Sequence, residues 1–394
     1  MKKIVNYKSI ETASVHAGEE FNITNAIVPP VWLSSNYKET SIEHLAKISA
    51  EDRPVKFYPR YNNPLSNQIS KQIAVLAQTE DAVVLCSGMA AISSAITCAL
   101  KAGDHIIAQK NLYAGTLKLL RDILPSFGVT TTFVEQENNE EFKKATKKNT
   151  KLIYVETPSN PLMKITDLKF IGKLGRKKGI MTMIDNTFAS PVNQCPVEFG
   201  IDVIIESCTK YLGGHFDLLA GVICGKKDFI FRAWDYAHII GQSLSPFDAS
   251  LLMRGIKTLS LRVKKQNENA GLLSEYLFRH KKVNKVYYPG LKSFSQYKLA
   301  RSQMKGYGGM LSFELKADYN STKKFLEGLK ICKISVSLGG IETLVTLPVS
   351  MWKPYYNKKQ LNAIGLSDSL IRMSAGIENI NDLILDIENG LKKI

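Results

Sequence analysis

The chain has 394 residues, of which 44% are hydrophobic and 22% are charged. This length is too great for one small core and suits a large domain with a smaller one, and the composition is that of a folded globular protein. Lysine and arginine number 52 against 36 aspartates and glutamates, a formal net charge of +16. The basic residues are dispersed and no DNA- or RNA-binding motif accompanies them, so we expect a lysine-rich surface and no nucleic-acid partner.

The cysteines and the apolar segments indicate the cellular compartment of the protein. The six cysteines lie mostly in apolar segments without a Cys-x-x-Cys pair, which favours buried free thiols over disulfides or zinc, and we expect no metal. Polar residues follow Met1-Lys2-Lys3-Ile4, so no signal peptide is evident. No apolar segment is long enough to span a bilayer. The sequence therefore predicts a cytoplasmic protein that does not bind a membrane.

Residues 1–65 lack sustained periodicity and contain Val28-Pro29-Pro30-Val31, and we interpret them as an extended arm. From residue 66 to 259, helical segments alternate with short apolar strands. In chain order, the sequence predicts a helix at 66–76, a strand at 82–85, a helix at 89–100, a strand at 105–108, a helix at 116–124, and strands at 130–134, 152–155, 180–184 and 203–205. This alternation predicts an α/β domain with a mainly parallel sheet, which binds ligands at the carboxyl ends of its strands.

The pattern changes towards the C-terminus. One long helix is predicted at 246–269, and after about residue 260 the strands become more antiparallel. The segments that follow are predicted as strands at 283–288, 309–315 and 343–347 and helices at 321–329 and 381–392, the last one capped by Asn379 or Asn381. We therefore predict a smaller α+β domain at 260–394.

Two charged residues follow neighbouring apolar strands. Lys210 follows the last predicted strand of the sheet in the sequence Glu-Ser-Cys-Thr-Lys-Tyr, and Asp185 closes the strand before it. An amine and a carboxylate held apart in one pocket suit pyridoxal phosphate, because the lysine bonds to the aldehyde and the aspartate keeps the ring nitrogen protonated. The hydroxyls of Ser207 and Thr209 are candidates for holding the phosphate. Taken alone, a lysine after a strand is more often a surface residue.

Two further motifs follow predicted strands. Ser87-Gly88-Met89 opens a helix, where a glycine lets backbone N–H groups approach a phosphate, although strand–glycine–helix junctions are common turns. Tyr113, in Asn-Leu-Tyr-Ala-Gly-Thr, is able to stack on a flat ring or donate a proton, although a packed tyrosine is the commoner case.

Taken together, these motifs resemble the pyridoxal-phosphate enzymes of Cys/Met metabolism, which include cystathionine γ-synthase, cystathionine γ-lyase, methionine γ-lyase and O-acylhomoserine sulfhydrylase. The resemblance runs from Val15-His16-Ala17-Gly18 to the C-terminal helix. Its other motifs are Tyr58-Pro59-Arg60-Tyr61-Asn62-Asn63-Pro64, Ser87-Gly88-Met89-Ala90-Ala91-Ile92, Tyr113-Ala114-Gly115-Thr116, Glu156-Thr157-Pro158-Ser159-Asn160-Pro161, Asp185-Asn186-Thr187, Ser207-Cys208-Thr209-Lys210-Tyr211, Ser337-Leu338-Gly339-Gly340 and Ile371-Arg372-Met373-Ser374. The resemblance implies the fold of a fold-type-I PLP-dependent transferase, with a large domain at 66–259 and a smaller C-terminal domain at 260–394.

The resemblance also implies a role for each matching residue. Lys210 would anchor the cofactor and carry protons between the α and β carbons of the substrate, and Asp185 would contact the ring nitrogen. Tyr113 would stack on the ring and act as acid or base at the γ-substituent. The other implied positions are Gly88, Met89, Ser207 and Thr209 at the phosphate, Asn160 and Thr187 near the ring, and Arg372 with Ser337 at the substrate carboxylate. For Asn160, Thr187 and Thr209 the alternative is hydrogen bonding at strand ends alone.

Tyr58 and Arg60 match a pair that reaches the phosphate of a neighbouring subunit. The arm of residues 1–65 is therefore expected to complete a neighbour's site. A complete site then needs at least a dimer, and the resemblance implies a homotetramer built as a dimer of dimers with shared active sites.

Several positions depart from the family pattern. Phe216 stands where relatives often have serine, and Met351-Trp352-Lys353 where they often have Met-Thr-His. Gly115 stands where dedicated methionine γ-lyases typically have cysteine, and Val336 where enzymes that handle cystathionine often have glutamate. The apolar bulk and the missing carboxylate favour a small or apolar γ-substituent over cystathionine, whereas Lys353 would suit an acidic one.

We expect a PLP-dependent lyase that eliminates the γ-substituent of an L-amino acid, as methionine γ-lyase does, and releases a 2-oxo acid and ammonia. The alternative within the family is a γ-replacement transferase, in which a nucleophile takes the place of the substituent. The alternative outside enzyme chemistry is a basic scaffold that binds nucleic acid on an inactive family fold. Retention of Lys210, Asp185, Tyr113 and Arg372 argues against this last alternative.

Overall fold

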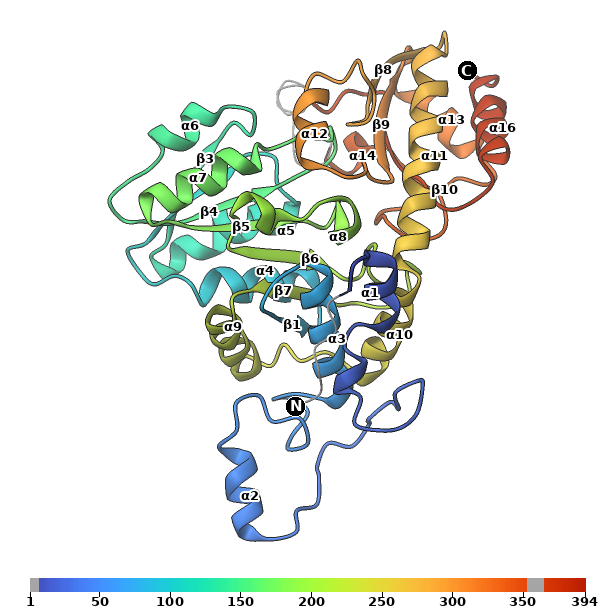
Figure 1. The fold of residues 1–394 in the computed structure, drawn as a ribbon. Helices are drawn as coiled ribbons and strands as arrows, with labels where there is room; N and C mark the ends of the chain where they lie inside the picture. Colours follow the sequence, from blue (N-terminus) through green and yellow to red (C-terminus); the bar gives the residue numbers. More distant parts are fainter. Residues whose placement is uncertain (1–6, 353–364) are drawn as a thin grey trace. The chain divides into compact units, whose positions relative to one another are not determined.

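The computed structural model describes residues 7–352 and 365–394, and it divides the chain into two compact units, each with its own sheet (Figure 1). Unit 1 contains Met1–Glu156 and Asp167–Ser260, and unit 2 contains Thr157–Thr166 and Leu261–Ile394. Lys353, considered above as a contact for an acidic substituent, lies outside the described residues.

Unit 1 is built on a seven-stranded sheet in the order β1-β7-β6-β5-β4-β2-β3. Its strands are β1 (Asp81–Leu85), β2 (His105–Gln109), β3 (Thr130–Val134), β4 (Thr150–Glu156), β5 (Met181–Asp185), β6 (Val203–Ser207) and β7 (Gly221–Gly225). The pairs from β3 through β2, β4 and β5 to β6 are parallel, whereas β7 runs antiparallel to both β1 and β6. The sheet is mainly parallel, as predicted, but the sequence patterns missed β7.

Helices cover the sheet of unit 1. They are α3 (Pro64–Leu76), α4 (Gly88–Thr97), α5 (Ala114–Lys118), α6 (Asn139–Lys144), α7 (Leu168–Lys178), α8 (Ser190–Asn193), α9 (Lys227–Ile239) and α10 (Pro246–Lys257), with a π-helical turn η2 (Leu119–Ile123) and the 3-10 turns η3 (Leu124–Phe127) and η4 (Pro196–Phe199). Ile92 of α4 and Ile230 of α9 share one buried core with Ile205 and Ile223 of the sheet. Because most strands of this sheet are buried on both faces, they consist of apolar runs, which is why the sequence revealed all of them except β7.

The arm predicted at residues 1–65 is less extended than expected. It contains α1 (Ile10–His16), the 3-10 turn η1 (Glu19–Phe21) and α2 (Ile42–Ser49), and the segment with α2 projects away from the sheet of the same unit (Figure 1). Each of the two α-helices begins after a serine, Ser9 or Ser41, whose hydroxyl accepts a backbone hydrogen bond from the first turn. These caps stabilise helices too short for their periodicity to be recognised.

The prediction of a single helix at 246–269 is wrong. The structure has α10 followed by α11 (Leu259–Arg279), and Thr258 separates them with φ −109° and ψ 7°. The backbone N–H and the hydroxyl of Thr258 both donate to the carbonyl of Gly255, at 3.2 Å each. A β-branched hydroxyl residue competes for backbone acceptors in this way, and the helix ends there.

Unit 2 contains a five-stranded sheet in the order β10-β11-β12-β9-β8, in which only the β10–β11 pair is parallel among the described strands. Its elements are β8 (Val283–Tyr287), α12 (Tyr297–Gln303), β9 (Met310–Leu315), α13 (Tyr319–Glu327), β10 (Lys333–Ile334), β11 (Leu344–Thr346), α14 (Pro348–Trp352), β12 (Leu370–Ser374) and α16 (Ile380–Leu391). The predicted antiparallel strands are present, whereas β10 and β12 were not predicted. Asn379 caps α16 by accepting from the backbone N–H of Asn381 at 2.9 Å.

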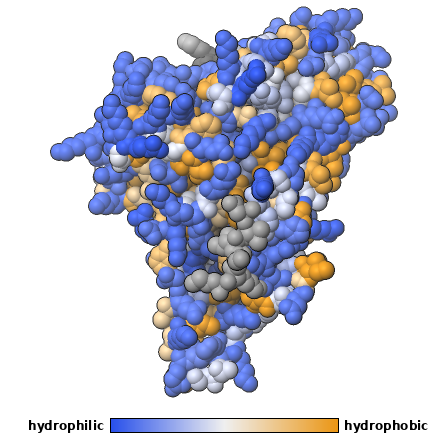
Figure 2. Space-filling model, viewed as in Figure 1, coloured by the Kyte–Doolittle hydropathy of each residue, from blue (hydrophilic) through white to orange (hydrophobic). Residues whose placement is uncertain are grey.

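The face of the molecule in Figure 2 is mainly polar. Hydrophilic residues cover most of the visible face, and apolar residues form separate groups (Figure 2). None of the helices in the described part of the chain combines the length and the apolar character that crossing a bilayer requires.

Asp386 of α16 is buried and holds the segment before β10. Its carboxylate accepts backbone hydrogen bonds from Lys330 (2.8 Å), Ile331 (2.9 Å) and Cys332 (3.0 Å). Because Asp386→Ala would leave these donors without that partner, we expect the free energy of unfolding in urea to fall by about 2–4 kcal/mol. The control Asp382→Ala, exposed in the first turn of the same helix, should lower it by at most about 1 kcal/mol. Equal losses in the two variants would contradict this account of Asp386.

Candidate active site

The carboxyl ends of β5 and β6 bring two of the predicted residues together. The strands are parallel neighbours with Asp185 opposite Ile205, Asp185 is the last residue of β5, and Lys210 follows the end of β6. Burial raises the pKa of Asp185, and the charge of Lys210 is near enough to oppose that rise. The amine and the carboxylate expected from the sequence therefore lie at one edge of the sheet in unit 1.

The environment of Asp185 balances burial against polar contacts. Burial raises the pKa of Asp185 above its usual value, while hydrogen bonds from Thr187 and the charge of Lys210 oppose the rise. One of these bonds runs from the backbone N–H of Thr187 to Oδ1 of Asp185 at 3.0 Å. A buried carboxylate of this kind is well placed to share a proton with a basic group of a ligand.

The N-terminus of α4 meets the end of β6 at a glycine. Ser87 caps α4 by accepting from the N–H of Ala90 at 3.0 Å, and Gly88 is the first helical residue. A Cβ on Gly88 would lie 2.8 Å from Cβ and 2.9 Å from Oγ of Ser207, so a residue with a side chain could not take this position without displacement. The free N–H groups of a helix N-terminus then lie beside the Ser207 hydroxyl, an arrangement that suits a phosphate.

Hydrogen bonds fix the loop around Ser207. The hydroxyl of Thr187 accepts from the backbone N–H of Ser207 at 2.8 Å. The hydroxyl of Thr209 accepts from the N–H of Ala220 at 3.1 Å and donates to its carbonyl at 3.3 Å. Thr187 and Thr209 therefore act, at the least, as strand-end hydrogen-bonding residues, the alternative considered for them above.

Tyr113 is held beside the same edge by a residue to which the sequence assigned no role. Its backbone N–H donates to Oε2 of Glu156 at 2.7 Å, and Glu156 lies opposite Asp185 in the sheet. A Cβ on Gly115 would lie 2.6 Å from Cε1 of Tyr113 and 2.8 Å from the sulfur of Met89. The structure thus gathers Tyr113 and Met89 around Gly115, with the tyrosine ring half-exposed.

Glu206 is a second residue that sequence reasoning missed. It precedes Ser207 in β6, is buried, and accepts from Nδ2 of Asn186 at 2.7 Å. Burial raises the pKa of Glu206 to about 8, the hydrogen bond from Asn186 lowers it, and the nearby Asp185 raises it. Glu206 therefore keeps its proton at neutral pH and adds no second negative charge beside Asp185. The signal in the sequence was a carboxylate inside an apolar strand.

Tyr58 and Arg60 lie on the segment before α3 in unit 1. Arg60 donates to the carbonyl of His238 at 2.8 Å, and its guanidinium lies 5.7 Å from the ring centre of Tyr58. Tyr58 is 41% exposed and Arg60 is half-buried beside it.

Unit 2 brings together the residues expected at the substrate carboxylate. Arg372 lies in β12, is buried, and donates to the carbonyl of Ser337 at 2.9 Å and to Oδ1 of Asn160 at 3.4 Å. Ser337 has φ +78°, a conformation that residues with side chains rarely adopt. This backbone conformation accompanies the contact between its carbonyl and the Arg372 guanidinium.

The positions that depart from the family pattern lie in both units. Phe216, half-buried with φ +59°, is on the same loop of unit 1 as Lys210. Trp352 ends α14 in unit 2, and Val336 of the same unit is 61% exposed.

Comparison with known proteins identifies the family. The family described as Cys/Met metabolism PLP-dependent enzymes matches residues 11–392. The chain belongs to this family. It is 39% identical over 386 residues to an L-methionine gamma-lyase of Fusobacterium nucleatum subsp. nucleatum, covering 97% of this chain and 98% of the relative. It is 38% identical over 388 residues to a cystathionine beta-lyase of Lactococcus lactis subsp. cremoris, covering 98% and 99%.

A solved structure agrees with this assignment. The chain superposes on metB from Corynebacterium glutamicum with a TM-score of 0.91 and 35% identity, covering 98% of each chain. The predicted family, the fold-type-I architecture and the cofactor are thereby confirmed, and the chain is a PLP-dependent enzyme of sulfur amino-acid metabolism. The relatives named above catalyse two different eliminations, so membership fixes the cofactor rather than the reaction.

The residues present in unit 1 fit pyridoxal phosphate. Asp185 supplies a buried carboxylate for a protonated ring nitrogen, and Lys210 supplies an amine at the same edge. The close approach of Gly88 to Ser207 supplies a position for the phosphate that a side chain would fill. The chemistry of these groups therefore matches the cofactor of the family.

Replacement of Gly88 tests this arrangement. Because the new methyl group in Gly88→Ala would displace the start of α4 from Ser207, we expect cofactor affinity to fall at least about tenfold. Titration of the visible absorbance of the bound cofactor measures the change. The control Gly271→Ala adds a methyl group to α11 where no atom lies within 4 Å, and it should bind cofactor as the parent does. Unchanged affinity in Gly88→Ala would remove Gly88 from the phosphate position.

The raised pKa of Glu206 predicts a pH dependence of stability. Between its ordinary pKa and about 8, the unfolded chain releases a proton that the folded protein retains, so stability falls as pH rises through this window. The side-chain amide introduced by Glu206→Gln would still accept from Asn186 without titrating. We therefore expect the melting temperature of this variant, saturated with cofactor, to fall less than that of the parent between about pH 5 and about pH 8. Glu275→Gln, at an exposed helical position, is the control and should follow the parent, and parallel curves for all three proteins would refute the assignment.

Proposed function

We propose that the chain is a PLP-dependent lyase that eliminates the γ-substituent of a small L-amino acid, with L-methionine as the model substrate. The observation that carries the proposal is the set of Lys210, Asp185 and the Gly88–Ser207 junction at one sheet edge, in a chain 39% identical to an L-methionine gamma-lyase. The reaction consumes L-methionine and water and gives methanethiol, 2-oxobutanoate and ammonia.

Three residues carry the proton transfers in this proposal. When bound, pyridoxal phosphate withdraws electrons from the amino acid and makes its α and then its β protons acidic. Lys210 anchors the cofactor, then takes and returns these protons, and Asp185 keeps the ring nitrogen protonated. Tyr113 stacks on the ring and protonates the departing γ-substituent. Its attachment to Glu156 supports this role, because it fixes the backbone of Tyr113 beside the strand that ends in Asp185.

The other residues bind and orient. We assign the phosphate to Gly88, Met89, Ser207 and Thr209, the neighbourhood of the ring to Asn160 and Thr187, and the substrate carboxylate to Arg372 with Ser337. The contact between Arg372 and the Ser337 carbonyl supports the last assignment, because it orients a buried guanidinium, and the planar fork of a guanidinium suits a carboxylate.

We also propose a homotetramer, a dimer of dimers in which Tyr58 and Arg60 contact the cofactor phosphate of a neighbouring subunit. Large apolar side chains on the same arm support an interface there. Ile27 is 89%, Val28 77% and Ile42 76% exposed in the described chain. A second copy of the chain would remove these side chains from water.

Two other reactions compete with γ-elimination. One is γ-replacement by a thiol, and the other is the β-elimination named for the Lactococcus lactis relatives. Val336 has no charge to meet a distal ammonium group, which favours methionine over cystathionine. Gly115 packs directly against Tyr113, so a cysteine there would displace the ring, and this difference from methionine γ-lyases keeps γ-replacement as the main alternative.

A substrate panel decides among the three reactions. L-Methionine, L-homocysteine, an O-acyl-L-homoserine and L-cystathionine are each incubated with and without an added thiol, with Lys210→Ala as the inactive control. We expect 2-oxobutanoate from methionine, a lower kcat/KM for cystathionine than for methionine, and no turnover in Lys210→Ala. Pyruvate from cystathionine as the fastest reaction would establish a β-lyase instead, and a new thioether in place of the 2-oxo acid would establish a transferase.

A further inference from the structure

A short segment of unit 1, residues 53–63, carries Tyr58 and Arg60 and begins at a sharp turn. Arg53 has φ +55°, a left-handed conformation that is unfavourable for a residue with a side chain. The carbonyl of Arg53 accepts from Nδ2 of Asn62 at 3.3 Å, which closes the segment into a loop. The position of Arg53 therefore determines where both ends of the loop lie.

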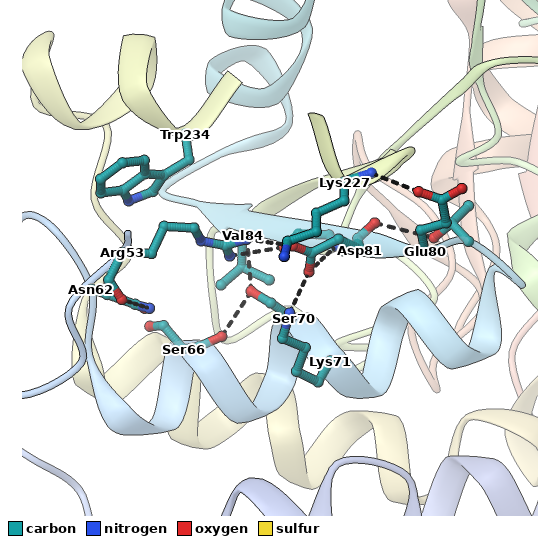
Figure 3. Close-up of polar contacts among 12 residues, drawn as sticks. Arg53, Asn62, Ser66, Ser70, Lys71, Glu80, Asp81, Val84, Lys227 and Trp234 are labelled. Atoms are coloured by element: carbon teal, nitrogen blue, oxygen red, sulfur yellow. Dashed lines mark hydrogen bonds and ion pairs between the residues drawn. The ribbon is translucent and has the colours of Figure 1, made fainter. Parts of the chain in front are cut away.

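The side chain of Arg53 is anchored on β1. It donates from one terminal nitrogen to Oδ2 of Asp81 at 2.8 Å and from the other to the carbonyl of Ala82 at 2.9 Å. The side chains of this ion pair are only 11% and 6% exposed. Figure 3 shows Arg53 and Lys71 reaching Asp81 from different elements, and Lys71 of α3 bonds to Oδ1 at 2.7 Å. The geometry satisfies both oxygens of a buried carboxylate at once.

Because the Arg53–Asp81 pair is buried, each residue depends on the other. A buried guanidinium is stable only where a carboxylate and acceptors meet it, and removal of one partner leaves an uncompensated charge. Arg53 Nε has no hydrogen-bond partner within the described chain, and a cavity of about 30 Å³ adjoins Arg53, Ser66 and Trp234. The two terminal nitrogens thus make the contacts that tie the loop to β1.

The other side of the loop is fixed to α9 and the segment after it. Trp234 Nε1 donates to the carbonyl of Tyr61 at 2.6 Å, and the hydroxyl of Ser243 donates to the carbonyl of Arg60 at 3.0 Å. The backbone near Arg60 is thus held on one side while Arg53 holds the other. Tyr58 lies between these two anchors with its ring exposed.

We propose that the Arg53–Asp81 ion pair is a positioning device that sets the loop carrying Tyr58 and Arg60. The inference rests on the proposed function, in which that pair contacts the cofactor phosphate of a neighbouring subunit. Arg53 and Asp81 touch neither cofactor nor substrate in this account. They act by fixing the loop. Their loss therefore weakens cofactor retention, while Lys210 can still bond to the cofactor.

The test uses the full-length enzyme loaded with cofactor. Arg53→Met and Asp81→Asn each break the ion pair, Arg60→Ala removes the direct contact, and Lys71→Met is the matched control that removes the other cation from Asp81 without touching the loop. Each protein is diluted into a scavenger of free cofactor, and loss of the visible band is followed with time. We expect cofactor release to be about tenfold faster in Arg53→Met and in Asp81→Asn and unchanged in Lys71→Met. A variant that combines Arg53→Met with Asp81→Asn should release cofactor no faster than either single variant, because both substitutions break the same ion pair. If Arg53→Met does not fold, Arg53→Lys, which keeps the charge without the second hydrogen bond, gives the same readout.

The outcomes separate the inference from the function on which it rests. A merely structural role would lower the melting temperature of the ion-pair variants without changing cofactor release, and that result overturns the inference. Release at the parent rate in Arg60→Ala also overturns it, because Arg53 would then have nothing to position. The proposed function fails separately, if the parent enzyme holds no cofactor that borohydride fixes to Lys210.

Discussion

The buried carboxylate of Asp185 is the constraint on which the rest of the site depends. A negative charge in the interior needs partners, and they come from the loops after β5 and β6: an N–H of Thr187 and the field of Lys210. Thr187 then uses its hydroxyl to hold Ser207, so the residues around the charge and around the phosphate position form one hydrogen-bonded structure. Under the proposed function, the residues at the ring nitrogen and those at the phosphate would therefore be held in place together.

The chain stabilises its buried carboxyl groups in different ways, and each way has a different consequence. Asp386 is met by three backbone N–H groups, which hold a segment of unit 2. Asp81 is met by two cations, which hold a loop of unit 1. Glu206 retains a proton, which spares Asp185 a neighbouring charge. The solution at Glu206 depends on pH near neutrality, because there the charge itself is removed by a proton.

The sequence predicted the parts of the fold and site that follow from local patterns. Most strands of the parallel sheet were recognisable because burial on both faces makes them mainly apolar, and the meeting of Lys210 with Asp185 followed because parallel neighbours end at the same edge. The missed features depend on tertiary contacts. The break at Thr258 lies in a continuous helical pattern, and the pairing of Arg53 with Asp81 joins residues that no periodicity relates. β7 escaped notice because it begins and ends at a glycine and follows β6 without an intervening helix.

Because of the place of β7 in the sheet, the order in which the strands are synthesised differs from the order in which they can pair. β1 pairs only with β7 in the described sheet, and β7 also joins it to β6, so β1 cannot enter the sheet until the chain has been made as far as Gly225. The strands β2 to β6 have their mutual partners earlier. The first strand to leave the ribosome is thus among the last to gain its hydrogen-bonded neighbour, and Val83 and Leu85 pair with β7 only after the strands in the middle of the sheet have been made.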